Sequence, residues 1–186
     1  MKNILILLVI VFTSISCSDK AKITKAIEKL QSQPIVLPTD EMKIVNTRDS
    51  VFRDFSHAEL KLVVYTDSLE CTSCAMNRMY EWEDIVALDT TYSNRIKFYF
   101  IFSPKHKNLK FTTRKLKAGI LSYPSFLDKS VKFLKDNPSI PNDRRLHSFL
   151  LDEKNNIILV GNPNENERIK KTFIKEVKKR LEQKNS

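Results

Sequence analysis

Two apolar stretches near the middle of the sequence predict buried strands. Residues 60–66 and 96–102 are almost continuously apolar and rich in β-branched and aromatic side chains, as expected for parallel strands covered on both faces. Shorter apolar stretches bounded by turn residues predict further strands. These lie at residues 42–45, 51–55, 121–127, 147–151 and 157–160.

The spacing of the shorter stretches indicates how they pair. Residues 42–45 and 51–55 would form a small hairpin or an edge strand beside the main sheet. The last two strands are separated by the polar residues 152–156, which predicts a second hairpin. Pro124 indicates an edge or entry position for the strand that contains it, because proline cannot donate a backbone hydrogen bond.

Between the strands, apolar residues recur at helical spacing. From Cys71 onward, Ala75, Met79, Trp82 and Val86 follow at steps of four, three and four, which predicts a helix with this stripe in the core. Further helices are predicted at residues 19–33, 108–118, 128–136 and 165–183. The order of the elements predicts an α/β fold, with a central mixed sheet flanked by helices on both faces and a short N-terminal extension.

Two cysteines lie between the first central strand and its helix. Cys71 and Cys74 are three positions apart, and this spacing in a first helical turn lets two sulfur atoms form a disulfide. The positive end of the helix would stabilise a thiolate. We therefore expect Cys71 to be the nucleophile and Cys74, one turn deeper, to be the resolving thiol.

The same spacing is also typical of half a zinc site, which normally needs a second pair of ligands. The remaining cysteine, Cys17, and the histidines His57, His106 and His147 are far apart in the sequence. A redox pair is thus favoured over a metal site or an inert structural pair. Asp67, at the end of the preceding strand, is a candidate for proton transfer to or from Cys74. A turn or helix-cap role is the alternative for this aspartate.

The N-terminus has the pattern of a secretory signal. A basic start is followed by the apolar residues 4–12 and by small residues up to Cys17; the apolar part is too short for a stable membrane span. Residues 14–17 resemble the lipobox of bacterial lipoproteins, which implies cleavage before Cys17 and acylation of its thiol. The predicted organisation is a signal peptide at 1–16, a lipid anchor and spacer at 17–40, and the folded domain at 41–186. We expect a lipid-anchored protein of the bacterial cell envelope that faces the periplasm.

Composition narrows the chemistry. The formal net charge is +10, but the lysines are dispersed among acidic residues, which favours a solvated surface over nucleic-acid binding. The chain has only two glycines, Gly119 and Gly161, so it contains no glycine-rich phosphate loop of the nucleotide-binding kind. No flavin or nicotinamide motif is present. We expect no bound cofactor, and electrons would come from another protein.

The ordered motifs resemble those of extracytoplasmic thioredoxin-fold proteins related to TlpA and ResA, over about residues 58–184. The matching segments are Val63-Val64-Tyr65 before Cys71-Thr72-Ser73-Cys74, then Tyr123-Pro124-Ser125-Phe126-Leu127-Asp128, and Ser148-Phe149-Leu150-Leu151-Asp152 before Asn156-Ile157-Ile158-Leu159-Val160-Gly161. The resemblance implies a thioredoxin-like domain that is a thiol–disulfide oxidoreductase. Its partners would be protein thiols and disulfides, together with an upstream donor or acceptor of electrons.

The sequence departs from that family at two places. A cis-proline precedes the next-to-last strand in the family, whereas Leu146 occupies this place here, between Arg145 and His147. A non-proline cis bond costs about 3 kcal/mol, so we expect a loop that is either trans or differently shaped. Thr72, Ser73, Leu146 and His147 would still form the surface that meets the partner. Glu70 replaces the tryptophan of thioredoxins and would oppose thiolate formation at Cys71.

Two alternative functions follow from these departures. Two thiolates and the imidazole of His147 would suit a soft metal such as Cu(I), as in Sco-like copper-binding proteins of the same fold. A role for His147 as an ordinary residue at the start of a strand is the simpler interpretation. The other alternative is a redox-inactive adaptor that binds a partner near Cys71 and Leu146, with the lysine-rich helices at residues 108–118 and 165–183 as its recognition surfaces. Replacing both cysteines by serine would separate the adaptor from the redox and metal functions.

Overall fold

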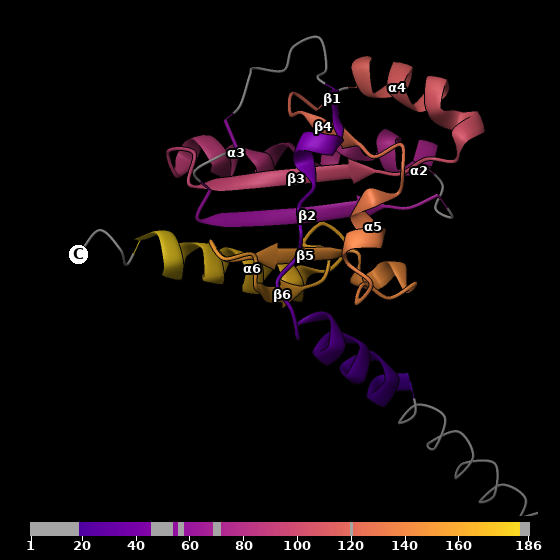
Figure 1. Ribbon diagram of the computed structural model, residues 1–186. Helices are drawn as coiled ribbons and strands as arrows, with labels where there is room; N and C mark the ends of the chain where they lie inside the picture. Colours follow the sequence, from indigo (N-terminus) through magenta and orange to yellow (C-terminus); the bar gives the residue numbers. More distant parts are fainter. Residues whose placement is uncertain (1–18, 46–53, 56–57, 69–71, 120, 183–186) are drawn as a thin grey trace, which may run out of the picture.

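The computed structural model describes residues 19–45, 54–55, 58–68, 72–119 and 121–182. Its strands form one mixed sheet, whose order across the sheet is β1-β4-β3-β2-β5-β6 (Figure 1). The strands are β1 (Lys43–Val45), β2 (Leu60–Thr66), β3 (Ile96–Phe102), β4 (Ser125–Leu127), β5 (Ser148–Leu151) and β6 (Ile157–Val160).

The centre of the sheet is parallel and its two sides are antiparallel. β2 and β3 run parallel in register from Leu60 opposite Ile96 to Thr66 opposite Phe102, and β4 is parallel to β3. β5 pairs antiparallel with β2, β6 with β5, and β1 with β4. The predicted central strands are therefore confirmed, and so is the hairpin of β5 and β6. The continuous apolar sequence of β2 and β3 fits strands that are covered on both faces.

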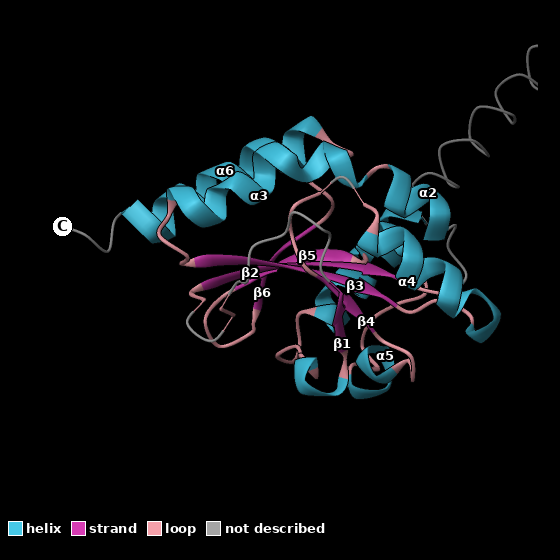
Figure 2. Ribbon diagram, turned by 90° about the horizontal axis from the view of Figure 1, so that it is seen from above, coloured by secondary structure: helices cyan, strands magenta, loops and turns pink. Residues whose placement is uncertain are grey.

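Helices cover both faces of the sheet. Figure 2 shows α3 and α6 on one face and α5 on the other. The labelled α-helices are α2 (Thr72–Asn77), α3 (Glu83–Thr91), α4 (Leu109–Lys117), α5 (Lys132–Asp136) and α6 (Glu167–Glu182). Within the described part of the chain, no helix combines the length and the apolar content that a bilayer span requires.

Each face of the sheet has its own hydrophobic core, because side chains alternate along each strand. The first core contains Leu62 and Phe100 from the central strands together with Trp82, Phe173 and Val177 from the helices. The second core contains, on the opposite face, residues of the same strands together with Phe133 of α5 and Leu146.

The segment that precedes β1 belongs to this second core. A helix spans residues 19–30, and its last residue, Leu30, is fully buried. Ile35 and Met42 are buried in the same cluster, and the backbone N–H of Ile35 donates to the carbonyl of Asn155 at 2.9 Å. Part of the region predicted as a spacer thus packs on the domain.

The helix predicted from Cys71 onward is divided into parts. α2 and α3 are separated by a 3₁₀ turn at Met79–Trp82. The predicted apolar stripe is nevertheless in the core: Met79, Trp82 and Val86 are buried in the first cluster and Ala75 packs against it. Its periodicity continues through the turn because the turn keeps these residues on the face that meets the sheet.

β4 is shorter than predicted and lies inside the sheet. Pro124 immediately precedes the strand, which starts at Ser125; this confirms the entry position. β1 is the edge strand, as one of the two interpretations of residues 42–45 anticipated. Residues 51–53 of the other expected strand lie outside the described residues.

An ion pair is buried between α3 and β3. The ammonium group of Lys97 lies 3.0 Å from an oxygen of Asp89, and the two side chains are 2% and 0% exposed. The hydroxyl of Tyr123 donates to the same carboxylate at 2.8 Å. The sequence analysis did not predict this pair, because the apolar pattern of β3 gives no sign that its lysine is buried.

Candidate functional site

The candidate site is at the C-terminal end of β2, where α2 begins. Cys74 lies on α2, is exposed, and is disulfide-bonded. The other two cysteines of the sequence, Cys17 and Cys71, lie outside the described residues. The helix after this buried strand therefore carries a disulfide-bonded cysteine at an exposed position.

The loop that precedes β5 lies beside the end of β2. Ser148 is the register partner of Val64, and the backbone N–H of Tyr65 donates to the carbonyl of His147 at 2.9 Å. The loop contains a 3₁₀ turn at Arg144–Leu146. No peptide bond among the described residues is cis, so the predicted trans geometry at Leu146 is confirmed.

Cys74 and this loop border one cavity of about 280 Å³. His147 lines it from the loop, and Trp82 and Phe100 line it from the first core. Its polar lining comes from Arg78, Glu81, Arg144, Arg145, Asn162, Asn164 and Glu165. The sulfur therefore lies beside a small, partly apolar cavity with charged groups around it.

Three arginines, Arg78, Arg144 and Arg145, are among the charged residues that line this cavity. Arg78 pairs with Glu81 at 2.9 Å and with Glu165 at 3.6 Å, and the hydrogen bond to Glu81 raises the pKa of the Arg78 guanidinium. Arg145 pairs with Asp143 at 2.6 Å; this hydrogen bond lowers the pKa of the Asp143 carboxyl. Both arginines are thus paired with neighbouring carboxylates, which offset their positive charge.

His147 is a buried structural residue of the loop. It is 2% exposed, and its ring packs against Tyr65 with centroids 5.4 Å apart. Nε2 lies 2.8 Å from the carbonyl oxygen of Pro141; since a carbonyl oxygen only accepts, Nε2 carries the hydrogen. This nitrogen is therefore occupied in holding the loop, which counts against the copper-ligand interpretation through Nε2.

The other residues singled out from the sequence occupy different environments. Asp67 is buried directly after β2, and Leu146 is buried in the second core; neither lines the cavity. Thr72 is the first residue of α2, and Ser73 is half-buried. Among the described residues, no three His, Cys, Asp or Glu side chains are grouped as a metal site requires.

Sequence reasoning missed the arginines and the acidic residues of the rim. Arg78 and Glu165 are far apart in the sequence and meet only because α2 and the segment before α6 cover the same face of the sheet. Arg144 was not singled out, although it lies two positions before Leu146. The sequence signal that could have found them is the pair Arg144 and Arg145, which lies directly before Leu146.

The strand order and the position of the cysteine define the class of protein. A sheet with parallel β3 and β2 followed by antiparallel β5 and β6, and a cysteine-bearing helix directly after β2, is the thioredoxin-like arrangement. This confirms the predicted fold class, a central mixed sheet with flanking helices.

Comparisons with solved structures return proteins of that class. The chain is similar to a thioredoxin-like protein from Bacteroides caccae ATCC 43185, with 8% identity and a TM-score of 0.48 over 87% of this chain and 56% of that one. It is also similar to the exposed lipoprotein thioredoxin Etrx1 of Streptococcus pneumoniae strain TIGR4, with 13% identity and a TM-score of 0.45 over 64% of this chain and 86% of that one. StoA from Bacillus subtilis has 19% identity and a TM-score of 0.43 over 64% of this chain and 87% of that one.

These similarities concern the fold. The chain spans just over half the length of the Bacteroides caccae protein, and all three identities are low. No protein family and no curated protein sequence matches the chain. The assignment to the thioredoxin-like class accordingly rests on the sheet topology described above.

Proposed function

We propose that this chain is a thiol–disulfide exchange protein of the bacterial cell envelope, with Cys71 and Cys74 as its redox pair. One observation carries the proposal: Cys74 is exposed and disulfide-bonded on the helix that directly follows β2. A disulfide at a helix start is accessible to a partner's sulfur. Cys71 is three positions away and is the proposed partner in the bond.

The proposed reaction is a pair of thiolate exchanges. The reduced Cys71 thiolate attacks a disulfide of the partner protein, and the S–S bond of the partner breaks. The leaving sulfur takes up a proton, and a mixed disulfide remains. The Cys74 thiolate then attacks the Cys71 sulfur, which forms the Cys71–Cys74 disulfide and releases the second partner thiol. Two electrons pass to the partner, and a dithiol protein restores the reduced pair; the reverse steps oxidise a partner.

Neighbouring groups would assist these steps. The positive end of α2 would favour the thiolate form of the attacking sulfur. Asp67 is the proposed group for proton transfer to or from Cys74, because it is buried at the end of the strand that leads to the site. Thr72 and Ser73 would contact the partner's chain, and the loop at Leu146 and His147 would do so through its exposed residues Arg144 and Arg145.

We further propose that the protein is held on a membrane through lipid on Cys17. The proposal rests on the lipobox-like residues 14–17. A protein described as an exposed lipoprotein thioredoxin is among the structures similar to this one. Several acyl chains on one residue hold a protein on a bilayer essentially permanently, since each buried methylene contributes about 0.8 kcal/mol.

The test is a redox titration of the full-length protein in non-ionic detergent. Samples equilibrated across glutathione buffers are quenched with a thiol-alkylating mass tag, and bound metal is measured on the same samples. We expect one reversible two-electron transition of Cys71 and Cys74, which Cys71→Ser and Cys74→Ser each abolish. Thiols that never form a disulfide, or stoichiometric copper or zinc on the pair, would overturn the proposal.

A further inference from the structure

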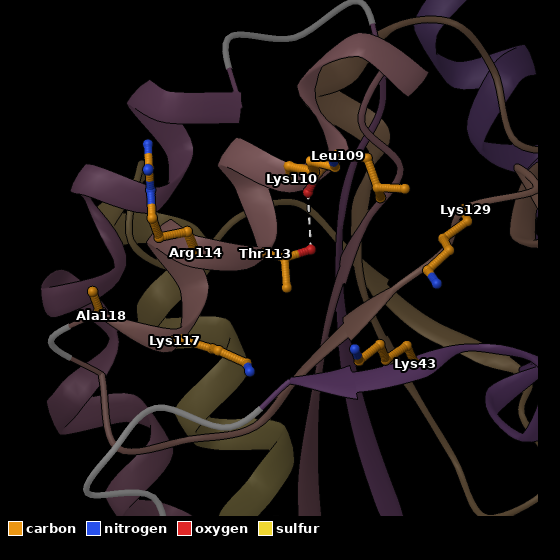
Figure 3. Close-up of a pocket in the computed structure, with 8 residues that line it drawn as sticks. All are labelled: Lys43, Leu109, Lys110, Thr113, Arg114, Lys117, Ala118 and Lys129. Carbon is orange, nitrogen blue, oxygen red and sulfur yellow. Dashed lines mark hydrogen bonds between the residues drawn. The ribbon is translucent and has the colours of Figure 1, made fainter.

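A second hollow in the surface lies between α4 and the edge of the sheet. It has a volume of about 600 Å³. Its basic residues come from three separate elements: Lys110, Arg114 and Lys117 from α4, Lys43 from β1, and Lys129 from the segment after β4 (Figure 3). We call this hollow the basic groove.

The basic groove concentrates positive charge without balancing carboxylates. None of its lining residues is acidic, and in the part of the chain that the structure describes none of its five cations forms an ion pair. The ammonium groups of Lys43 and Lys117 point toward each other (Figure 3). Cations gathered in one hollow produce a local potential that attracts an anionic ligand.

The basic groove also has a less polar part of its lining. Leu109, Thr113 and Ala118 line it together with the cations. The Thr113 hydroxyl donates within α4 to the carbonyl of Leu109 at 2.8 Å (Figure 3), so it offers no donor to a ligand. A large apolar side chain, Phe111, is also exposed on α4. The surface therefore fits a ligand that combines carboxylates with apolar side chains.

The position of the basic groove favours a partner protein over the membrane. α4 packs against α2, the helix that carries Cys74. The helix over residues 19–30, which leads toward the proposed anchor, leaves the domain on the side away from α4 (Figure 1). A groove on this side would face away from the anchoring bilayer and toward a partner protein that docks at α2.

β1 adds a means of holding an extended chain. It is the edge strand and pairs only with β4 within the described sheet. A peptide laid along such an edge directs alternate side chains to one side. Alternate acidic residues of that peptide would then face the cations of α4.

We infer that the basic groove binds an acidic segment of the protein whose disulfide is exchanged at Cys71 and Cys74. The inference rests on the proposed function, since it identifies the partner of that site by its chemistry. Acidic residues near a partner's disulfide would hold the partner while its sulfur reaches the exposed end of α2.

The experiment measures binding separately from exchange. The probe is a fluorescein-labelled peptide, without cysteine, in which Glu alternates with Ser and Leu; anisotropy is followed with the full-length protein in non-ionic detergent at physiological ionic strength. The test variant is Lys110→Gln/Arg114→Gln/Lys117→Gln. The matched control is Lys171→Gln/Lys175→Gln/Lys178→Gln, which removes the same charge from exposed positions of α6.

We expect the α4 variant to weaken binding by about tenfold or more, since it removes three charge contacts, and the α6 variant to weaken it less than about twofold. A peptide with Gln in place of Glu should not bind. Equal losses in the two variants, or no binding to the native protein, would overturn the inference. Binding to anionic phosphatidylglycerol vesicles through the α4 cations, without binding of the peptide, would also overturn it in favour of a membrane contact.

Two further measurements separate this inference from the proposed function. Cys74→Ser should bind the peptide as tightly as the native protein, because the groove does not include the sulfur. With a disulfide added to the peptide, the native protein should reduce the Glu version faster than the Gln version. Binding without any exchange would refute the proposed function and the partner role while leaving an anion-binding groove; exchange at equal rates for both peptides would refute this inference alone.

Discussion

The buried pair of Lys97 and Asp89 gives the sharpest prediction about stability. Lys97→Met removes the ammonium group but keeps a flexible apolar chain of similar length. The Asp89 carboxylate then loses a cation that lies 3.0 Å away, in a place where its own side chain is 0% exposed. Its hydrogen bond from Tyr123 at 2.8 Å remains.

The size of the effect follows from this burial. Removing one partner of a buried ion pair typically costs about 3–5 kcal/mol, because a charge is left without compensation in a region of low dielectric. A domain of ordinary size has a free energy of unfolding of about 5–15 kcal/mol. We therefore expect Lys97→Met to remove about a fifth of the stability or more. Lys97 also donates to Asn94 at 3.2 Å, which adds to the loss.

The assay is urea unfolding at neutral pH, followed by the fluorescence of Trp82. A double variant, Lys97→Met/Asp89→Leu, removes both charges and should be more stable than Lys97→Met alone, because no unpaired charge remains. The control is Lys132→Met, which breaks the surface pair with Asp136 at 2.8 Å and should have a much smaller effect.

The reasoning would be refuted if Lys97→Met lost less than about 1 kcal/mol. It would also be refuted if the double variant lost more stability than Lys97→Met and Asp89→Leu lose together. Either result would mean that the pair is not effectively removed from water. If Lys97→Met strongly changes the slope of unfolding free energy against urea concentration, its unfolded state is altered. The double variant would then be compared with the native protein instead.

Two more predictions concern a buried carboxylate beside the start of α5 and the pH dependence of stability. Asp128 is 1% exposed and accepts from the backbone N–H of Lys132 and Phe133 at 2.9 Å. Asp128→Ala should therefore cost about 3 kcal/mol in urea unfolding, whereas Asp128→Asn should recover part of it. The pKa of Asp143 is lowered by its hydrogen bond from Arg145, so this carboxylate stabilises the fold above its unfolded pKa, and the effect disappears as the pH falls through the lowered folded value. Asp143→Asn should lose a little stability at pH 7, and the gap to the native protein should close toward about pH 2 in acid unfolding; a constant gap would contradict this.

Much of the fold could be predicted from local pattern. β2, β3 and β6 have the predicted bounds, and β5 differs by one residue. α4 and α6 were also anticipated closely, because a continuous apolar stretch and a one-sided apolar stripe are local properties of the chain. The Cys-x-x-Cys spacing likewise pointed to the start of α2 as the candidate site.

Other features could not be predicted from the sequence, because periodicity shows that a residue is buried without showing what covers it. The place of β4 between β1 and β3 is a matter of pairing between distant segments. The burial of Leu30 and Ile35 depends on the second core, which those residues share with Phe133 and Leu146.

The chemistry of the surfaces divides in the same way. The sequence alone indicated the cysteine pair and the lysine-rich helix that forms α4, but it did not single out the arginines near Leu146. Only the tertiary structure decided their neighbours. It placed Arg78 beside Glu165, engaged Nε2 of His147 with Pro141, and brought Lys43 and Lys129 to the cations of α4. The physical reason is that charge acts through space, so its effect depends on distances and burial that only the folded chain specifies.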